Sequence, residues 1–298
     1  MSARRPLVSR LVVGAATIAC FSALAGADAT GAAGAPAAAW LLPIAVVAAA
    51  GGAVEAVRLA AARGIGLAPW LVPLGAAGIA AAPAAAVWCG AAGQHPLAAL
   101  GGVTVACGAV LAAVFGTEIV RYAPDRGSLA RACGSALAAI AIGVPLAFVV
   151  ALRLLPAADG GRPPLVPLVS LIAVVKAADI AAYAVGSLAG RHRMAPRLSP
   201  GKTWEGAAAA LVAAAVAAWL VIERGSGAGP KPAGGWLAFG LCVGIAGIAG
   251  DLSESLVKRE LHAKDSGAAL GGMGGCLDLV DSLLLAAPVA WVLWALGS

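Results

Sequence analysis

The stretch GDLSESLVKRELHAKDSGAALGGMGGCLDLVDS, from Gly250 to Ser282, places a dense mixture of charges between two apolar runs. It holds six of the 14 acidic residues of the 298-residue chain and three basic ones, namely Asp251, Glu254, Glu260, Asp265, Asp278, Asp281, Lys258, Arg259 and Lys264. Charges beside bilayer-spanning helices are costly to keep and by default mark a functional site. Acids and bases mixed with glycines indicate metal-assisted chemistry on an anionic, phosphorylated substrate.

Composition places the whole chain in the membrane class. Hydrophobic residues make up 61% of it and charged residues 11%, whereas a soluble domain carries about 25% charged residues. Runs long enough to span a bilayer occur at 9–26, 38–55, 69–89, 96–117, 132–152, 164–186, 206–223, 235–252 and 280–297. We therefore predict an all-α fold, a polytopic integral membrane bundle of about nine transmembrane helices. Residues 1–165 would form N-terminal transmembrane helices, and residues 166–298 a transmembrane catalytic region with two cytoplasmic loops.

The distribution of basic residues predicts how these helices are oriented. With the N-terminus inside, fifteen of the 20 Lys and Arg residues fall in cytoplasmic segments and four in external ones, while Lys176 lies within a span. Cytoplasmic loops carry the excess of Lys and Arg, so we predict the N-terminus inside, the C-terminus outside and both charged loops on the cytoplasmic face. The formal net charge of +6 then reflects topology and phosphate contact, and we expect no nucleic-acid partner.

The first apolar run leaves two interpretations open. Arg4 and Arg5 precede residues 9–26 as in a secretory signal peptide. Eight further spans follow, which favours an uncleaved first helix.

In the last charged loop, helical spacing groups the functional side chains. Asp251, Ser255 and Lys258 fall on a single helical face, and Asp278 and Asp281 are three residues apart. Glu254 and Lys258 are four residues apart, a spacing that suits a simple ion pair. Two crowded carboxylates repel each other, and a divalent ion resolves that repulsion. Mg²⁺ takes one or two carboxylates together with substrate phosphate oxygens. This pattern favours a metal site over a flexible hinge with solvated charges.

A second charged segment begins inside the span at 164–186. Asp179 and Tyr183 share a helix face, and Ser199 followed by Pro200 is typical of a helix start. A helix N-terminus beside Lys202 and Thr203 would seat a phosphate. An ordinary basic loop with a well-capped helix explains this segment equally well.

Several other polar residues are predicted to be structural. Lys176 and Asp179 are expected to compensate each other within the membrane. Glu55 and Glu118 are interpreted as partners of nearby arginines. The six cysteines show no metal-binding spacing, and Cys276 alone is weak support for a nucleophile.

These residues resemble the phosphatidate cytidylyltransferase family, the CDP-diacylglycerol synthases. The family signature is matched in register by Ser255, Val257, Lys258, Arg259, Lys264, Asp265, Gly267, Leu270, Gly271, Gly274, Gly275, Asp278 and Asp281. An upstream block is matched by Asp179, Tyr183, Gly186, Gly190, Ser199, Pro200, Lys202, Thr203, Glu205 and Gly206. The resemblance covers residues 170–285 and departs from the family pattern at Met273, Cys276 and Leu279.

The resemblance implies attack by a phosphatidate oxygen on the α-phosphate of CTP, which gives CDP-diacylglycerol and pyrophosphate. The residues expected to be catalytic are Asp251, Lys258, Arg259, Lys264 and Asp265. Those expected to bind substrate are Asp179, Tyr183, Ser199, Lys202, Thr203 and Ser255. The expected metal ligands are Asp251, Asp278 and Asp281. Mg²⁺ is the expected cofactor, and a second cation is left open.

The implied partners are CTP, phosphatidate and membrane lipid, with a homodimer left open. We expect an integral protein of the bacterial inner (cytoplasmic) membrane whose active site faces the cytoplasm. One alternative is a CTP-dependent kinase or transferase acting on a polyprenol or another lipid. A secondary transporter, which should show inverted repeats and a midplane site, is the alternative from another class.

Overall fold

The computed structural model describes residues 20–90, 97–123, 127–157, 161–225, 229–261 and 275–297. Within these ranges eight helices are long and apolar enough to cross a membrane. They are α2 (Leu42–Ala61), α3 (Leu71–Trp88), α4 (Ala98–Val120), α5 (Ser128–Arg153), α6 (Val166–Ala189), α7 (Trp204–Ala218), α8 (Gly235–Glu260) and α9 (Cys276–Gly297). The span of α7 includes the π-helix η2 (Trp219–Glu223) that continues it, and the span of α9 is Val280–Gly297. The all-α, polytopic membrane bundle is therefore confirmed as the fold class.

Eight of the nine predicted spans coincide with these helices. Of the first predicted span, 9–26, residues 9–19 lie outside the described residues, while residues 20–30 are helical and lead to a short 3₁₀ turn, η1 (Ala32–Gly34). The main difference is at the charged end, where α8 continues to Glu260 rather than ending at residue 252. An ion pair between Glu254 and Lys258, four residues apart, supports this extension. Part of the predicted charged loop is therefore helix.

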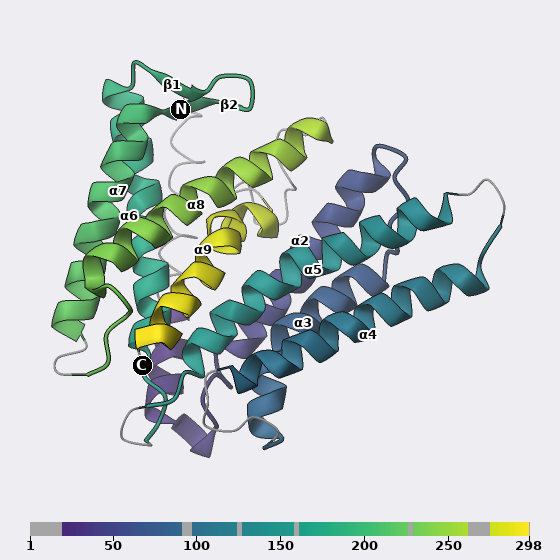
Figure 1. Cartoon of the computed structure of the whole chain (residues 1–298), viewed down its shortest axis with the longest axis horizontal. Coiled ribbons are helices and arrows are strands. Elements are labelled where there is room, and N and C mark those ends of the chain that lie inside the picture. Colours follow the sequence, from purple (N-terminus) through teal and green to yellow (C-terminus); the bar gives the residue numbers. More distant parts are fainter. Residues whose placement is uncertain are drawn as a thin grey trace, which may run out of the picture.

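Two groups of helices lie on either side of α8 and α9 (Figure 1). The helices α6 and α7 pack against each other on one side, and α2 to α5 form the other group. The helix α9 contacts α2, α5, α6 and α8, and its buried Ala286, Ala287 and Ala290 join the largest apolar cluster of the described residues. The last helix therefore connects the predicted N-terminal and catalytic regions.

The segment between α6 and α7 forms a small β-hairpin instead of a simple loop. The strands β1 (Arg193–Ala195) and β2 (Ser199–Thr203) pair antiparallel, with Ala195 opposite Ser199. The predicted helix start at Ser199 and Pro200 is wrong, since α7 begins at Trp204. Thr203 caps it instead, because its hydroxyl accepts a hydrogen bond from the Gly206 N–H at 3.1 Å.

A buried ion pair lies at the end of the bundle opposite the hairpin. Arg153, at the end of α5, donates from Nε to Asp28 Oδ2 at 2.6 Å, and both side chains are fully buried. Asp28 also accepts from the backbone N–H groups of Ala38 and Trp40, each at 3.2 Å. These contacts hold the helical residues 20–30 against the end of α5, where Arg153 lies 125 residues after Asp28 in the sequence.

Candidate active site

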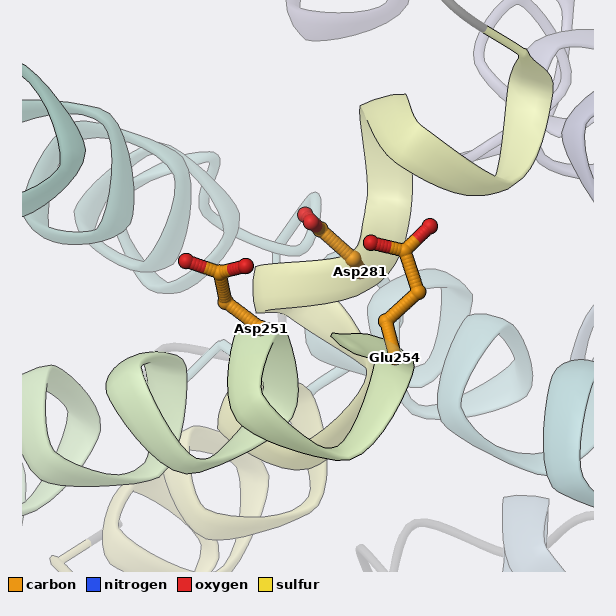
Figure 2. Close-up of side chains that lie close together, drawn as sticks. All are labelled: Asp251, Glu254 and Asp281. Atoms are coloured by element: carbon orange, nitrogen blue, oxygen red, sulfur yellow. The ribbon is translucent and has the colours of Figure 1, made fainter. Parts of the chain in front are cut away.

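The candidate active site is centred on three carboxylates that two helices bring close together. Asp251 and Glu254 lie on α8 and Asp281 lies on α9 (Figure 2). One oxygen from each can be chosen so that all three lie within 4.8 Å of one another. Gly250 allows this approach, because a Cβ atom there would lie 2.6 Å from the Asp281 carbonyl oxygen. Oxygen ligands at this spacing suit a hard divalent cation.

Asp278 lies beside this group but is held by other partners. Its Oδ2 accepts from the Gly275 N–H at 2.6 Å, as an acidic side chain does in the first turn of a capped helix. Its Oδ1 forms an ion pair with Lys258, whose Nζ also lies 2.9 Å from Glu254 Oε1. Of the predicted ligands, the structure thus brings Asp251 and Asp281 together, adds Glu254, and pairs Asp278 with Lys258.

The hairpin between α6 and α7 reaches this group directly. Lys202 Nζ lies 2.7 Å from Asp251 Oδ2, and 18% of the Lys202 side chain is exposed. From the other direction, Arg259 of α8 donates from Nε to the Leu198 carbonyl oxygen at 3.1 Å. The two charged segments of the sequence are therefore at the same end of the bundle, as predicted.

Asp179 joins the group from α6. It pairs with Lys176 at 3.3 Å, as predicted. The Ser282 hydroxyl lies 3.3 Å from both Asp179 carboxylate oxygens and 3.0 Å from Asp281 Oδ1. The buried Ser282 therefore links two acids that are about a hundred residues apart in the sequence.

A cavity of about 650 Å³ opens beside these groups. Its polar lining includes Asp179, Tyr183, Lys202, Thr203, Asp251, Asp278, Asp281 and Ser282. Small side chains of α6, α7 and α8 line the rest, among them Ala178, Ala182, Ala207, Ala210, Gly244 and Gly247. The polar and apolar parts suit a ligand with an anionic headgroup and an apolar body.

A second cavity of about 190 Å³ shares part of this lining. It is lined by Asp251, Glu254, Ser255, Lys258, Arg259, Asp278 and Asp281. The predicted residues Ser255 and Arg259 are thus beside the carboxylates, whereas Ser199 lies in β2 and lines neither cavity.

Some predicted residues lie outside the part of the chain that the structure describes. These are Lys264, Asp265, Met273 and the side chain of Leu279. Cys276 is described, and it precedes the spanning part of α9, Val280–Gly297. Burial raises the pKa of its thiol, and the nearby Glu55 charge acts in the same direction. A thiol with a raised pKa is a poor nucleophile, which agrees with the weak support that the sequence gives for a nucleophile at Cys276.

Sequence reasoning did not assign Glu254 or Ser282 to the site. Glu254 is three residues from Asp251, so the two share a helix face, but its spacing to Lys258 suggested only an ion pair. Ser282 directly follows Asp281, and no spacing rule distinguishes it. Both assignments depend on how α6, α8 and α9 pack.

Comparison with known proteins identifies the chain's relatives. The model of the cytidylyltransferase family matches residues 9–296. A phosphatidate cytidylyltransferase of Mycobacterium leprae is 40% identical over 163 residues, 54% of this chain and 50% of the relative. A phosphatidate cytidylyltransferase of Brucella suis is 45% identical over 131 residues, which are 43% of this chain and 47% of the relative. One of Haemophilus influenzae is 38% identical over 117 residues, which are 39% of this chain and 41% of the relative.

These matches to curated relatives span about half the length of each relative or less. The family model, in contrast, extends over nearly the whole chain and includes the hairpin, the carboxylate cluster and the helices that carry them. The chain is therefore a polytopic membrane protein that belongs to the cytidylyltransferase family.

Proposed function

We propose that the protein is a CTP:phosphatidate cytidylyltransferase, which makes CDP-diacylglycerol and pyrophosphate for phospholipid synthesis. The observation that carries this proposal is the meeting of Asp251, Glu254 and Asp281 with Lys202 and Lys258 beside a 650 Å³ cavity. Membership of the cytidylyltransferase family supplies the reaction class. The names of the relatives in three bacteria support the choice of lipid.

In the proposed reaction, a phosphate oxygen of phosphatidate attacks the α-phosphorus of CTP. A new P–O bond forms, the bond from that phosphorus to the bridging oxygen breaks, and pyrophosphate leaves with the electron pair. Such transfers depend mainly on positioning and charge neutralisation. The protein therefore has to bring two anionic reactants together.

The basic residues at the site fit that task. Lys202 and Lys258 stand beside the carboxylates, and Arg259 lines the smaller cavity. We assign these three cations to the phosphates of CTP and lipid, because opposite charge offsets the repulsion between the two substrates. Lys264 and Asp265 keep the catalytic roles that the family resemblance implies.

The acidic residues fit a divalent cation. Asp251 and Asp281, with Glu254 added by the geometry, offer oxygen ligands within 4.8 Å of one another. Asp278 lines the same two cavities and remains a proposed ligand. When bound, Mg²⁺ would neutralise charge on the phosphates and orient them. Asp251 is also held by Lys202 and Asp281 by Ser282, which limits their rotation.

The position of the cavity suits a lipid substrate. Lys202, Asp278 and Asp281 line it near the end of the bundle that carries the hairpin, and its small apolar residues come from α6, α7 and α8. The acyl chains can remain in the bilayer while the phosphate reaches the cations. We propose that this end faces the cytoplasm, where CTP is available, and that the membrane is the bacterial inner membrane.

The assay that tests this function uses purified protein with CTP, phosphatidate and Mg²⁺. We expect a CDP-lipid and pyrophosphate in equal amounts, and neither product when Mg²⁺ is chelated. Polyprenol replaces phosphatidate in a parallel reaction. If that reaction instead yields a phosphorylated polyprenol and CDP, the protein is a CTP-dependent lipid kinase and the proposal is wrong.

A further inference from the structure

The helix α2, far from the signature residues in sequence, holds the beginning of α9. Glu55 is buried, with 4% exposed. Its Oε1 accepts from the Cys276 N–H at 2.8 Å and its Oε2 accepts from the Leu277 N–H at 2.9 Å. The first N–H groups of a helix have no partner within it, and a carboxylate at that end also interacts favourably with the helix dipole. Glu55 thus caps α9, and among the described residues it has no arginine partner, contrary to the sequence prediction.

The same part of the chain also contacts the end of α8. Arg63, just after α2, donates from Nε to the Leu261 carbonyl oxygen at 2.9 Å. Leu261 directly follows α8, and a cation at a helix C-terminus complements the dipole there. The acid that caps the start of α9 and the base that contacts the end of α8 therefore both come from residues 55–63.

Close packing reinforces these contacts. A Cβ atom at Gly51 would lie 2.7 Å from Cys276 Sγ, and one at Gly52 would lie 3.7 Å from Leu277 Cδ1. Leu277 also joins Ala49 and Ala53 of α2 in an apolar cluster. The first turn of α9 is therefore seated directly on α2.

The first two turns of α9 carry two acids of the proposed metal site. Asp278 follows Leu277 directly and Asp281 comes one turn later. A small rotation or translation of α9 would move both carboxylates relative to Asp251 and Glu254 on α8. The contacts of Glu55 and Arg63 oppose such movement at both helices.

We propose that Glu55 and Arg63 form a clamp through which α2 positions the carboxylates of α8 and α9, with Glu55 as the principal positioning residue. This inference deepens the proposed function, because it rests on the metal site assigned there. It gives the N-terminal helices a role in the chemistry, although their residues lie outside the family signature.

The test measures Mn²⁺ binding to purified full-length protein by electron paramagnetic resonance, without substrate. Glu55→Gln keeps the shape but offers one carbonyl oxygen where two acceptors are needed. We expect Mn²⁺ to bind about tenfold more weakly, as on loss of an outer support of a metal site. Glu55→Asp keeps the charge and should bind Mn²⁺ more tightly than Glu55→Gln.

Glu118→Gln is the matched control. Glu118 is also a buried acid on a membrane helix, but its partner is Arg131 of α5 at 2.5 Å. Its loss should lower stability and leave Mn²⁺ affinity unchanged. Equal Mn²⁺ affinity in wild type and Glu55→Gln, or an equal loss in Glu118→Gln, would overturn the clamp.

A second readout separates failure of the clamp from failure of the proposed function. If the wild-type protein binds no Mn²⁺, the metal assignment fails, and amide hydrogen exchange still tests the clamp. Faster exchange at Cys276 and Leu277 in Glu55→Gln than in wild type would support positioning of α9 by Glu55. Unchanged exchange there would refute it.

Discussion

At the scale of single residues, the site contains side chains that each form ion pairs or hydrogen bonds with two carboxylates. Lys258 lies between Glu254 and Asp278, and Ser282 lies between Asp179 and Asp281. Charged groups near a membrane are costly unless they are paired and hydrogen-bonded. The pairing therefore allows a dense acidic group to persist, and it also fixes where each carboxylate points.

Asp281→Asn tests the proposed metal site. The amide keeps the shape of the side chain and removes the charge, so turnover should fall by roughly two to three orders of magnitude, the scale on losing one electrostatic stabiliser. Membrane insertion and melting temperature should hardly change. Activity is measured across a range of Mg²⁺ concentrations.

Glu223→Gln is the control for that experiment. Glu223 pairs with Lys231 at 2.5 Å, outside both cavities. The Glu223→Gln variant should retain wild-type turnover. Near-normal turnover in Asp281→Asn would remove this residue from the metal site.

Lys202→Gln tests the contribution of the hairpin to substrate binding. Lys202 lines the cavity and lies 2.7 Å from Asp251. Loss of one charged hydrogen-bonding group should lower kcat/KM for CTP by about ten- to a hundredfold. Steady-state kinetics with varied CTP checks this, and an unchanged kcat/KM would place the triphosphate elsewhere.

At the scale of helices, small residues set how closely the elements approach. Gly250 brings α8 against α9 at Asp281, and Gly206 brings α7 against α6, where a Cβ atom would lie 2.8 Å from the Ala182 carbonyl oxygen. Small residues are common at helix interfaces in membranes because they let backbones approach closely. Here that approach also brings the functional side chains of different helices within reach of one another.

Gly240→Ala tests this packing. A Cβ atom at Gly240 would lie 2.8 Å from Ala215 Cα of α7, so the variant should lose about 1–3 kcal/mol of stability through overpacking. Its melting temperature in detergent should fall. Gly108→Ala in α4 is the matched control, because a Cβ atom there meets nothing within 4 Å. A melting temperature for Gly240→Ala equal to that of Gly108→Ala would contradict the close contact of α7 and α8.

At the scale of the whole molecule, polar contacts concentrate at two opposite places along the bundle. The hairpin, the end of α8, the start of α9 and Arg63 meet at one place. Asp28 and Arg153 form a separate buried pair at the end of α5. This separation agrees with the sorting of basic residues into two sets of loops.

The topology prediction follows from that sorting. A reporter fused after Ser298 should be external, and a reporter inserted in the hairpin at residues 196–198 should be cytoplasmic. Paired alkaline phosphatase and fluorescent protein fusions measure the two sides. A cytoplasmic signal at the C-terminus would contradict the predicted number of spans.

Local patterns in the sequence were sufficient for the helices and for several pairs within them. A helix in lipid must satisfy its own backbone hydrogen bonds over about 20 apolar residues, so eight spans could be located from composition alone. Lys176 with Asp179 and Glu254 with Lys258 followed from helical spacing. The membership of Asp251 and Asp281 in the site followed from the charge density of a single stretch.

Only the tertiary structure decided the contacts between distant segments. Ser199 and Pro200 satisfy a helix-start pattern but lie in a strand, because the chain after α6 turns back and pairs with itself. Glu55 caps α9 from 221 residues away, and Lys202 reaches Asp251 from another helix pair. Such contacts depend on how the helices pack against one another. Helical spacing relates only residues within one helix, so it does not predict them. Helical spacing therefore determined which side chains share a face, and helix packing determined which faces meet.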